Sequence, residues 1–358
     1  MKKVFVISQG YPSEERRYLQ SFLHARSKEY KRQGIDVSVI SFSTKNSYEF
    51  DNIKVYNEKE GVEALKKNGP SIILLHAPNL KNHVRFYLKY KKYFYWTFLF
   101  FHGHEVLKEK DIYPKPYFFN KKQRRKNKLA NFYDALKIPI ITKFLKKIIS
   151  SGRYDLVFVS KWMLDETNKS TLINLKESNR VHIINNSLNE FIKEGAYKLS
   201  DKKADFITIR PLDTAKYSID LVVDLAKANP DRTFHIYGKG KYFDYNEKPS
   251  NITVLNEFIH PKDMPTLFNQ YNCALMPTKA DAQGLMMCEM ATYGMPIITS
   301  DLPVCHEMLD EYDNVMFIDN ERFNHKLSKL PSQHKNLISK FDYSKTVQRE
   351  IDLIKAIK

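Results

Sequence analysis

The chain has 358 residues, a length that predicts two domains of ordinary size. Apolar residues make up 42% of it, which excludes a disordered chain, and its 11 Gly and 15 Pro exclude collagen-like and low-complexity sequences. Its three cysteines form no Cys-x-x-Cys pair, which excludes a disulfide framework and a zinc ribbon. We therefore expect a globular protein of a reducing compartment.

Hydropathy along the chain predicts no membrane-spanning helix. Such a helix needs about 20 apolar residues, and the longest apolar stretch, residues 93–101, has about half that length. The apolar run at residues 4–7 is too short for a signal peptide, and charged residues follow it at 14–17. We expect a cytoplasmic protein that binds the inner face of the cell membrane peripherally.

Positive charge is concentrated in residues 81–147. This region holds 18 Lys or Arg and four Asp or Glu, so it carries an excess of 14 of the net charge of +17. Its densest basic run, residues 121–128, follows the aromatic segment 117–119. Basic side chains beside exposed aromatic ones suit an anionic membrane surface, which is the partner we expect. A solvated lysine-rich face is the main alternative, and nucleic acid is the least favoured partner.

The first half of the chain alternates apolar runs with helical patterns, which is typical of a parallel α/β sheet. The run at 94–102 is aromatic throughout, which indicates a strand buried on both faces. Strands are expected at residues 3–8, 36–42, 71–76, 94–102, 155–160 and 182–185, and helices at 14–33 and 81–92.

A polar stretch at 194–205 predicts a linker, after which the alternation restarts. Strands are expected at 206–210, 233–238, 251–255, 273–277 and 296–300, and helices at 216–228, 264–269, 285–293 and 343–358. The sequence therefore predicts two doubly wound α/β domains, 1–196 and 197–340, and a C-terminal helix, 341–358, that packs back on the first. Ligands of such sheets bind at the carboxyl ends of the strands, so we expect a site in the cleft between the domains.

Two acidic residues, Asp281 and Glu289, are separated by seven residues that include Gly284. The glycine permits a close backbone approach, and Leu285 and Met286 would begin a helix whose free N–H groups favour an anion. A diphosphate on these amides would have one acid toward each of its ends. Acids at this spacing also occur by chance, but here the strand, glycine, helix and next strand follow in the order that such a site requires.

This stretch and its continuation, residues 291–300, resemble the donor-binding segment of retaining glycosyltransferases of the GT-B fold, and most closely glycosyltransferase family 4. The resemblance implies two Rossmann-like domains and transfer of a sugar from a nucleotide sugar. It implies that Asp281 contacts the donor sugar and Glu289 the ribose. It also implies that the amides of Leu285 and Met286 contact the phosphates. The family usually has Glu where Asp281 stands, so the side chain here is one methylene shorter.

The segment Arg210-Pro-Leu-Asp-Thr-Ala-Lys216 resembles the family's pair of cations on the leaving diphosphate. Fixed cations at that position stabilise the charge that grows as the glycosidic bond breaks. The family has Gly where Tyr217 stands, and two ordinary surface cations are the alternative. Gly238-Lys-Gly240 resembles the family's Gly-x-Gly near the nucleotide, and Ile259 lies in a segment similar to the one that lines the base.

Candidate residues of the first half follow strands of the expected sheet. The resemblance implies that His102 reaches the donor sugar and that Glu105 contacts acceptor or sugar; a loop-capping role is the alternative for His102. The loop at 9–13 carries one glycine and is similar to the Tyr-Pro-Ser variant of relatives that build surface polysaccharides. This similarity implies that Gly10 lies near the acceptor and the donor phosphate, and it makes Tyr11 a candidate contact of acceptor or sugar.

No Asp-x-Asp motif occurs in the chain, so we expect no metal and no other cofactor. The resemblance implies a metal-independent hexosyltransferase that uses a UDP- or GDP-sugar. The expected acceptor is a glycan or lipid-linked sugar of cell-surface polysaccharide or glycoconjugate synthesis. The alternative is a non-catalytic GT-B-like partner subunit of another transferase. Asp281 and Tyr217, which differ from the residues that the family usually has at these positions, are compatible with this alternative. No nucleic-acid partner is expected.

Overall fold

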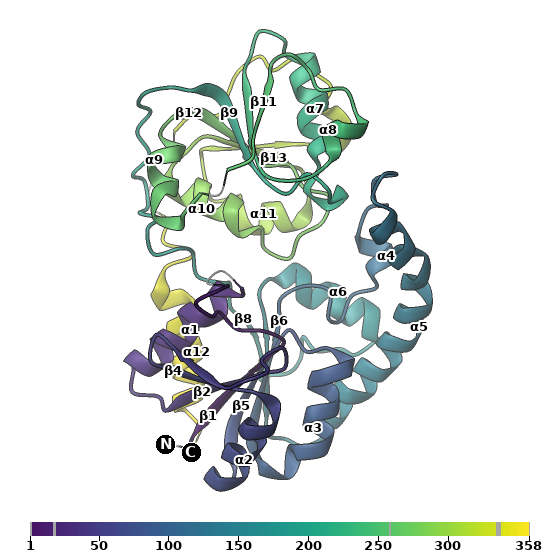
Figure 1. Ribbon diagram of the computed structural model, residues 1–358, viewed down its shortest axis with the longest axis vertical. Helices are drawn as coiled ribbons and strands as arrows, with labels where there is room; N and C mark the ends of the chain where they lie inside the picture. The colour runs from purple at the N-terminus through teal and green to yellow at the C-terminus, as the bar shows by residue number, and fades with distance from the viewer. Residues whose placement is uncertain (1, 17–18, 258, 334–337, 358) are drawn as a thin grey trace. The chain divides into compact units, whose positions relative to one another are not determined.

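The computed structural model describes residues 2–16, 19–257, 259–333 and 338–357, and its chain forms two compact units (Figure 1). The first unit contains Met1–Lys108, Tyr133–Ser187 and Phe341–Lys358, and the second contains Glu109–Phe132 and Leu188–Lys340. The C-terminal segment therefore belongs with the first unit. Residues 109–132 belong with the second unit, whereas the sequence places them in the first domain. The reason is burial, because Tyr117 and Phe119 pack against the core of the second unit.

The first unit is built on an eight-stranded sheet in the order β3-β4-β2-β1-β5-β6-β7-β8, in which only β3 is antiparallel to its neighbour. The strand order reverses between β1 and β5, so a crevice is expected where these two strands end. The strands are β1 (Val4–Ser8), β2 (Val37–Ser41), β3 (Tyr48–Phe50), β4 (Ile53–Tyr56), β5 (Ser71–His76), β6 (Phe94–Phe101), β7 (Tyr154–Phe158) and β8 (Val181–Ile183).

Helices cover both faces of this sheet. In Figure 1, α1 and α12 lie on one side of the strands, and α3 and α6 lie on the other. Helix α5 begins in residues of the second unit and continues into the first. The helices are α1 (Ser21–Arg32), α2 (Glu58–Asn68), η1 (Leu80–Val84), α3 (Arg85–Tyr90), η2 (Lys91–Tyr93), α5 (Lys121–Ile149), α6 (Lys161–Thr171), η6 (Tyr343–Lys345) and α12 (Val347–Lys355).

A buried ion pair fixes α12 on the first unit. Arg26 Nε in α1 donates to both carboxylate oxygens of Glu350 in α12, at 3.0 and 3.2 Å, and each side chain is only 1% exposed. The Tyr30 hydroxyl donates to the same carboxylate at 2.5 Å, and Arg26 Nη2 donates to Asn186 Oδ1 at 2.9 Å. Apolar residues of α12, among them Ile351, complete the core on this face of the sheet.

The second unit is built on six parallel strands in the order β11-β10-β9-β12-β13-β14, and this order reverses between β9 and β12. Figure 1 shows α7 and α8 on one side of this sheet and α10 and α11 on the other. The strands are β9 (Ala204–Ile209), β10 (Phe234–Tyr237), β11 (Ile252–Leu255), β12 (Tyr271–Leu275), β13 (Ile297–Ser300) and β14 (Val315–Ile318). The helices are α4 (Glu109–Ile112), η3 (Ala215–Tyr217), α7 (Ile219–Ala228), α8 (Tyr242–Tyr245), η4 (Pro261–Asp263), α9 (Met264–Phe268), α10 (Leu285–Tyr293), α11 (Pro303–Leu309) and η5 (Asn320–Arg322).

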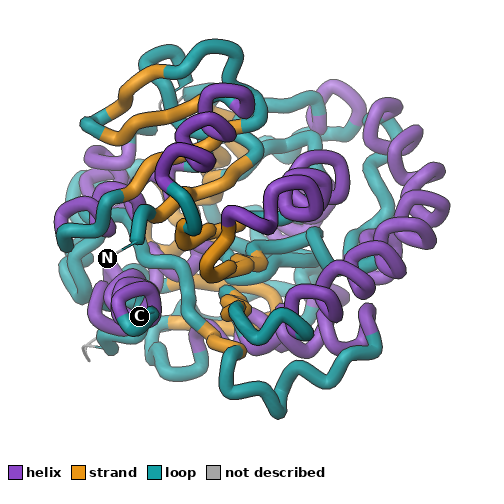
Figure 2. Tube along the Cα trace, turned by 90° about the horizontal axis from the view of Figure 1, so that it is seen from below, coloured by secondary structure: helices purple, strands orange, loops and turns teal. Residues whose placement is uncertain are grey.

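Most predicted elements are present, and the differences have local causes. The helix predicted at 14–33 begins only at Ser21, after Gln20 in the left-handed region at φ 53°. The helix predicted at 81–92 is divided into a π-turn, α3 and a 3-10 turn. Helices also form at α2, α5, α6 and α11, and strands at β3, β4 and β14, where the sequence predicts none. Figure 2 colours the described helices and strands along the chain. Within the described residues, no helix has both the length and the apolarity that crossing a bilayer requires.

Candidate functional site

The carboxyl edge of the second sheet gathers most of the predicted donor-site residues. Arg210 follows β9 and Gly238 follows β10, while the segment that leads to α10 follows β12. Arg210 Nη2 donates to the carbonyl of Met276 at 3.0 Å, and the N–H of Lys279 donates to the carbonyl of Lys216 at 3.0 Å. The structure therefore brings the two predicted cations against the loop that precedes α10, at the strand reversal.

Arg210 is a buried cation that forms no ion pair with a carboxylate of the described residues. Its side chain donates only to backbone carbonyls, those of Met276 and Tyr217, and its Nε has no hydrogen-bond partner among the described residues. Burial lowers the pKa of Arg210 to about 10, which nearby Asp281 partly offsets. The guanidinium remains charged at neutral pH, and a buried charge of this kind is costly until an anion pairs with it.

Lys216 lies in the segment that follows Arg210, and its ammonium is near two aromatic rings. Its ammonium is 4.9 Å from the ring centroid of Tyr217 and 5.7 Å from that of Tyr113, both within cation–π range. Across the part of the chain that the structure describes, no carboxylate pairs with it. The Tyr217 ring also lies 5.7 Å from the guanidinium of Arg210. The Tyr217 ring is therefore within cation–π range of both cations.

The beginning of α10 presents uncapped amides. Gly284 is the N-cap residue, at φ 69°, and no side chain caps the helix. The positive φ of Gly284 favours glycine at this position, and a Cβ there would lie 2.9 Å from Met287 Cε, the flexible end of that side chain. Leu285 and Met286 follow and are partly exposed. Uncapped amides at a helix N-terminus favour an anion, as the sequence predicts.

The two predicted acids have different surroundings. Asp281 Oδ1 accepts the N–H groups of Ala282 at 2.8 Å and Gln283 at 3.4 Å, so this carboxylate orders the turn before Gly284. Glu289 is 9% exposed, and its Oε1 accepts the N–H of Asn189 at 3.0 Å. Burial raises the pKa of Glu289 to about 7, against the lowering effect of that hydrogen bond. Glu289 therefore changes its charge near neutral pH.

The predicted glycines hold the loops after β9 and β10 together. A Cβ at Gly238 would lie 1.9 Å from the carbonyl oxygen of Arg210, and a Cβ at Gly240, which has φ 147°, would lie 2.8 Å from the N of Asp213. Both glycines thus support the Arg210 loop through close backbone contact. Ile259 is partly buried. Its neighbour Phe258, which belongs to the same predicted segment, lies outside the described residues.

We expect Gly238→Ala to lower the free energy of unfolding by roughly 2–3 kcal/mol, because the added methyl group must displace the backbone of Arg210. Denaturant unfolding of the purified variant measures this effect. Gly103→Ala is the control, since a Cβ there meets nothing within 4 Å. Equal stability of the two variants would contradict the close approach at Gly238.

A further segment, for which the sequence predicts no role at this site, adjoins it. This segment, residues 109–120, is called the strap. The Tyr117 hydroxyl donates to Asp220 Oδ1 at 2.8 Å, and Asn120 Nδ2 donates to the carbonyl of Asp213 at 3.0 Å. Tyr113 supplies one of the rings near Lys216. The prediction that the aromatic residues 117–119 are exposed is therefore wrong for Tyr117 and Phe119, which pack against the core of the second unit. Of these three residues, only Phe118 is exposed.

At the carboxyl edge of the first sheet, His102 follows β6 and forms a pair with His76. His102 Nε2 and His76 Nδ1 share a hydrogen bond of 3.1 Å, and the ring of Phe22 lies 4.9 Å from that of His102. Burial and the charge of Arg26 lower the pKa of His102 to about 3, while a hydrogen bond with Asn186 opposes this shift. His102 is therefore neutral at physiological pH.

The other predicted residues of the first unit make local contacts. Tyr11 is 2% exposed in the core, and its hydroxyl bonds His24 Nδ1 at 2.9 Å. Glu105 is buried, and its Oε2 accepts the N–H of Gly103 at 2.7 Å, which is a loop-capping role. A Cβ at Gly10 would lie 3.0 Å from a methyl carbon of Leu19. Sugar, phosphate or acceptor contact by these residues stays a prediction.

In the described ranges, no cluster of three or more His, Cys, Asp and Glu side chains could hold a metal ion.

Comparison with known proteins agrees with this geometry. Residues 208–332 match the family model of glycosyl transferases group 1, and no curated protein matches the chain. The structure is similar to that of TarM (13% identity, 90% of each chain, TM-score 0.58). It is also similar to sucrose-phosphate synthase from Thermosynechococcus elongatus (10% identity, 90% of this chain and 87% of that one, TM-score 0.64). A third similar structure is WaaG, a glycosyltransferase involved in lipopolysaccharide biosynthesis (12% identity, 90% of this chain and 88% of that one, TM-score 0.58).

The predicted GT-B fold of two Rossmann-like units is therefore confirmed, and the family match in the second unit supports sugar transfer.

Proposed function

We propose that the protein is a glycosyltransferase that moves a sugar from a nucleoside-diphosphate sugar to a glycan or lipid-linked acceptor, with retention of the anomeric configuration, as in glycosyltransferase family 4. The observation that carries this proposal is the buried guanidinium of Arg210, which forms no ion pair among the described residues and lies at the same edge of the sheet as Lys216 and the uncapped start of α10. A diphosphate supplies the negative charge that this arrangement requires.

The same groups suit the chemical step. The bond between the sugar C1 and the diphosphate oxygen breaks, and the acceptor oxygen bonds to C1 on the same face. The acceptor's proton passes to an oxygen of the leaving diphosphate. Arg210, Lys216 and the first amides of α10 stabilise the charge on that leaving group, so the proposal requires no metal ion.

Uridine diphosphate is the first nucleotide to test. A TarM structure contains UDP and alpha-GlcNAc-glycerol, and a trehalose-6-phosphate protein from E. coli has been solved with UDP-2-fluoro glucose. Both are similar to this chain in fold, at 12% and 11% identity. They support a UDP-sugar donor and a hydroxyl-bearing acceptor here.

We expect UDP binding to strengthen from about pH 6 to about pH 8 by up to roughly tenfold. Glu289, whose pKa is raised to about 7, ionises over this range, and a carboxylate accepts ribose hydroxyls better than a carboxyl group does. Calorimetric titration at several pH values measures the change. With the Glu289→Gln variant, the phosphate groups of UDP still titrate over this pH range, but the side chain at position 289 does not. An identical pH profile for both proteins would contradict the ribose contact.

We further propose that α5 binds an anionic membrane surface, at the cytoplasmic face where lipid-linked acceptors are used. One stripe of the helix, at helical spacing, consists of apolar residues that are between 45% and 70% exposed, namely Leu129, Phe132, Tyr133, Leu136 and Ile140. Its first two turns carry exposed cations, namely Lys121, Lys122, Arg124, Arg125, Lys126 and Lys128. Apolar side chains beside a cluster of cations are typical of helices that lie in a membrane interface.

The double variant Leu129→Gln/Phe132→Gln is expected to bind phosphatidylglycerol-containing vesicles about tenfold more weakly than the unchanged protein, because it removes two exposed apolar anchors. Vesicle sedimentation at low salt measures this difference. Leu172→Gln is the control, as Leu172 is 88% exposed but outside α5. If the unchanged protein does not bind such vesicles, the membrane proposal fails.

The enzyme itself is tested by turnover. Purified protein is incubated with UDP-, GDP- and dTDP-sugars and a panel of sugar acceptors, and released nucleoside diphosphate is measured. We expect one donor to be consumed only when an acceptor is present, with the product anomer matching the donor. A protein that binds a nucleotide sugar tightly but never turns it over, even with lipid-linked acceptors, would instead be the non-catalytic partner subunit.

A further inference from the structure

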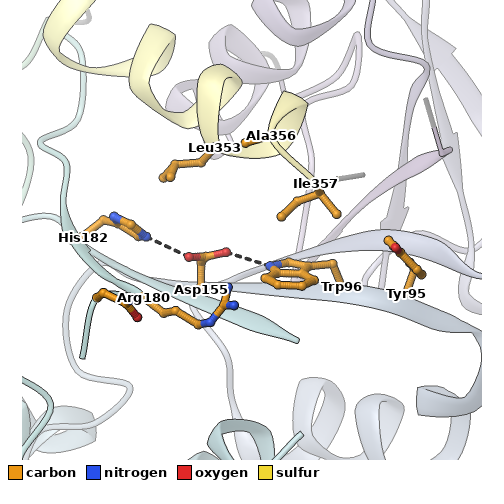
Figure 3. A pocket seen from close by; sticks show the side chains of 9 residues that line it. Tyr95, Trp96, Asp155, Arg180, His182, Leu353, Ala356 and Ile357 are labelled. Atoms are coloured by element: carbon orange, nitrogen blue, oxygen red, sulfur yellow. Dashed lines mark hydrogen bonds and ion pairs between the residues drawn. The ribbon is translucent and has the colours of Figure 1, made fainter. Parts of the chain in front are cut away.

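A pocket of about 500 Å³ opens on the first unit near the amino ends of β6, β7 and β8 (Figure 3). This is the opposite end of the strands from the edge where His102 follows β6. The volume falls in the range of pockets that bind small organic molecules. The pocket lining consists of Tyr95, Trp96, Asp155, Asn179, Arg180, His182, Leu353, Ala356 and Ile357.

A buried carboxylate organises the polar end of this pocket. Asp155 is 5% exposed, its Oδ2 accepts the indole N–H of Trp96 at 2.7 Å, and its Oδ1 lies 2.8 Å from His182 Nε2. Figure 3 shows these two contacts on either side of the carboxylate. Both oxygens are thus occupied from within the protein. The indole and imidazole rings are thereby held in fixed orientations around the pocket.

Arg180 is the cation of the pocket, and its charge is not neutralised by a partner. Its guanidinium lies 4.7 Å from the ring centroid of Trp96, a cation–π contact. Among the residues that the structure describes, its side chain forms neither an ion pair nor a hydrogen bond. The guanidinium donors therefore remain available to a ligand, while the indole limits the freedom of the side chain.

The remaining walls of the pocket are apolar or aromatic. Leu353, Ala356 and Ile357, from α12 and its end, lie across from Trp96 in Figure 3, and Tyr95 lies beside Trp96. A ligand that reaches Arg180 would therefore bury an apolar portion against these side chains. Burial of that portion supplies affinity that a lone surface arginine does not provide.

We propose that this pocket binds a small organic monoanion, a carboxylate joined to a ring or a short apolar chain. The planar guanidinium of Arg180 pairs with the carboxylate, and the apolar part lies between Trp96 and α12. A phosphate dianion is disfavoured relative to a monoanion, because the carboxylate of Asp155 lines the same pocket and repels two negative charges more strongly than one. The inference is independent of sugar transfer, since its residues lie at the other end of the sheet.

The test uses 4-phenylbutyrate as the probe and Trp96 as the reporter. The chain has two tryptophans, so Trp162→Phe leaves Trp96 as the only one. We expect a saturable change in its fluorescence with a dissociation constant on the order of 0.1–1 mM. Arg180→Gln in this background should weaken binding at least about tenfold. Arg322→Gln, at an exposed arginine of the second unit, should leave it unchanged.

Three further ligands test the chemistry of the site. The neutral amide 4-phenylbutyramide should bind much more weakly than the acid, acetate should bind weakly for lack of an apolar part, and inorganic phosphate should not compete. Leu353→Ala, which leaves the charges in place, should also weaken binding of the acid. Absence of a saturable signal, equal binding by Arg180→Gln, or equal binding of the amide or phosphate would overturn the proposal. UDP binding should be the same in all of these variants, which separates this result from that of the proposed transfer.

Discussion

Replacing Lys216 by Ala is expected to lower the rate of sugar transfer by roughly 10²–10³-fold while leaving the fold intact. Lys216 is partly exposed, its ammonium lies near the rings of Tyr217 and Tyr113, and it has no carboxylate partner among the described residues, so its loss breaks no ion pair. Its charge is needed most when the diphosphate leaves. The effect should therefore be larger on kcat than on the affinity for the donor.

Steady-state kinetics with the donor identified by the turnover assay measure this loss. Lys227→Ala is a matched control, because Lys227 is exposed on α7 of the same unit, away from the carboxyl edge of the sheet. Lys216→Arg, which keeps the charge, should recover part of the rate. Turnover by Lys216→Ala at the unchanged rate would remove this residue from the proposed mechanism.

Replacing Glu350 by Ala is expected to lower the free energy of unfolding by about 3–5 kcal/mol, which is the usual cost of leaving a buried charge unpaired. Arg26 and Glu350 are each 1% exposed, and Tyr30 loses its hydrogen-bond acceptor in the same change. The loss should appear as a lower denaturation midpoint of the full-length protein. Since the pair joins α1 to α12, the variant should also expose α12 to proteolysis.

A surface pair serves as the comparison for this variant. Glu58 bonds Arg85 with both side chains partly exposed, at 32% and 45%, so Glu58→Ala should cost less than about 1 kcal/mol. The double variant Arg26→Met/Glu350→Leu should recover much of the loss, because it removes both buried charges together. A cost for Glu350→Ala as small as that of Glu58→Ala would show that the pair does not hold α12.

The sequence predicts those parts of the fold whose signals are local. The helix predicted at 285–293 is confirmed as α10, because Gly284 and Gly294 mark its two ends. Spaced apolar residues predict the final helix, confirmed as α12 at Val347–Lys355. The capping pair Asn57 and Glu60 could also have predicted α2, since the Asn57 side chain accepts the N–H of Glu60 at 3.0 Å.

Contacts between distant parts of the chain could not be predicted in this way. Arg26 and Glu350 lie 324 positions apart, and no sequence pattern links them. The strap is a second case, because its aromatics have the composition of a membrane-facing segment, yet Tyr117 and Phe119 bury against the second unit. Arg210 shows the same limit at the site. The sequence shows that Arg210 follows a strand, but that its guanidinium donates to carbonyl groups and forms no ion pair among the described residues depends on how the fold surrounds it.

A crystal structure of the protein with UDP or GDP bound is the most direct test of the central claim. We expect diphosphate oxygens within hydrogen-bond distance of the amides of Leu285 and Met286, with Arg210 and Lys216 also contacting them. A diphosphate bound instead along the basic residues 121–128, with the start of α10 unoccupied, would contradict it.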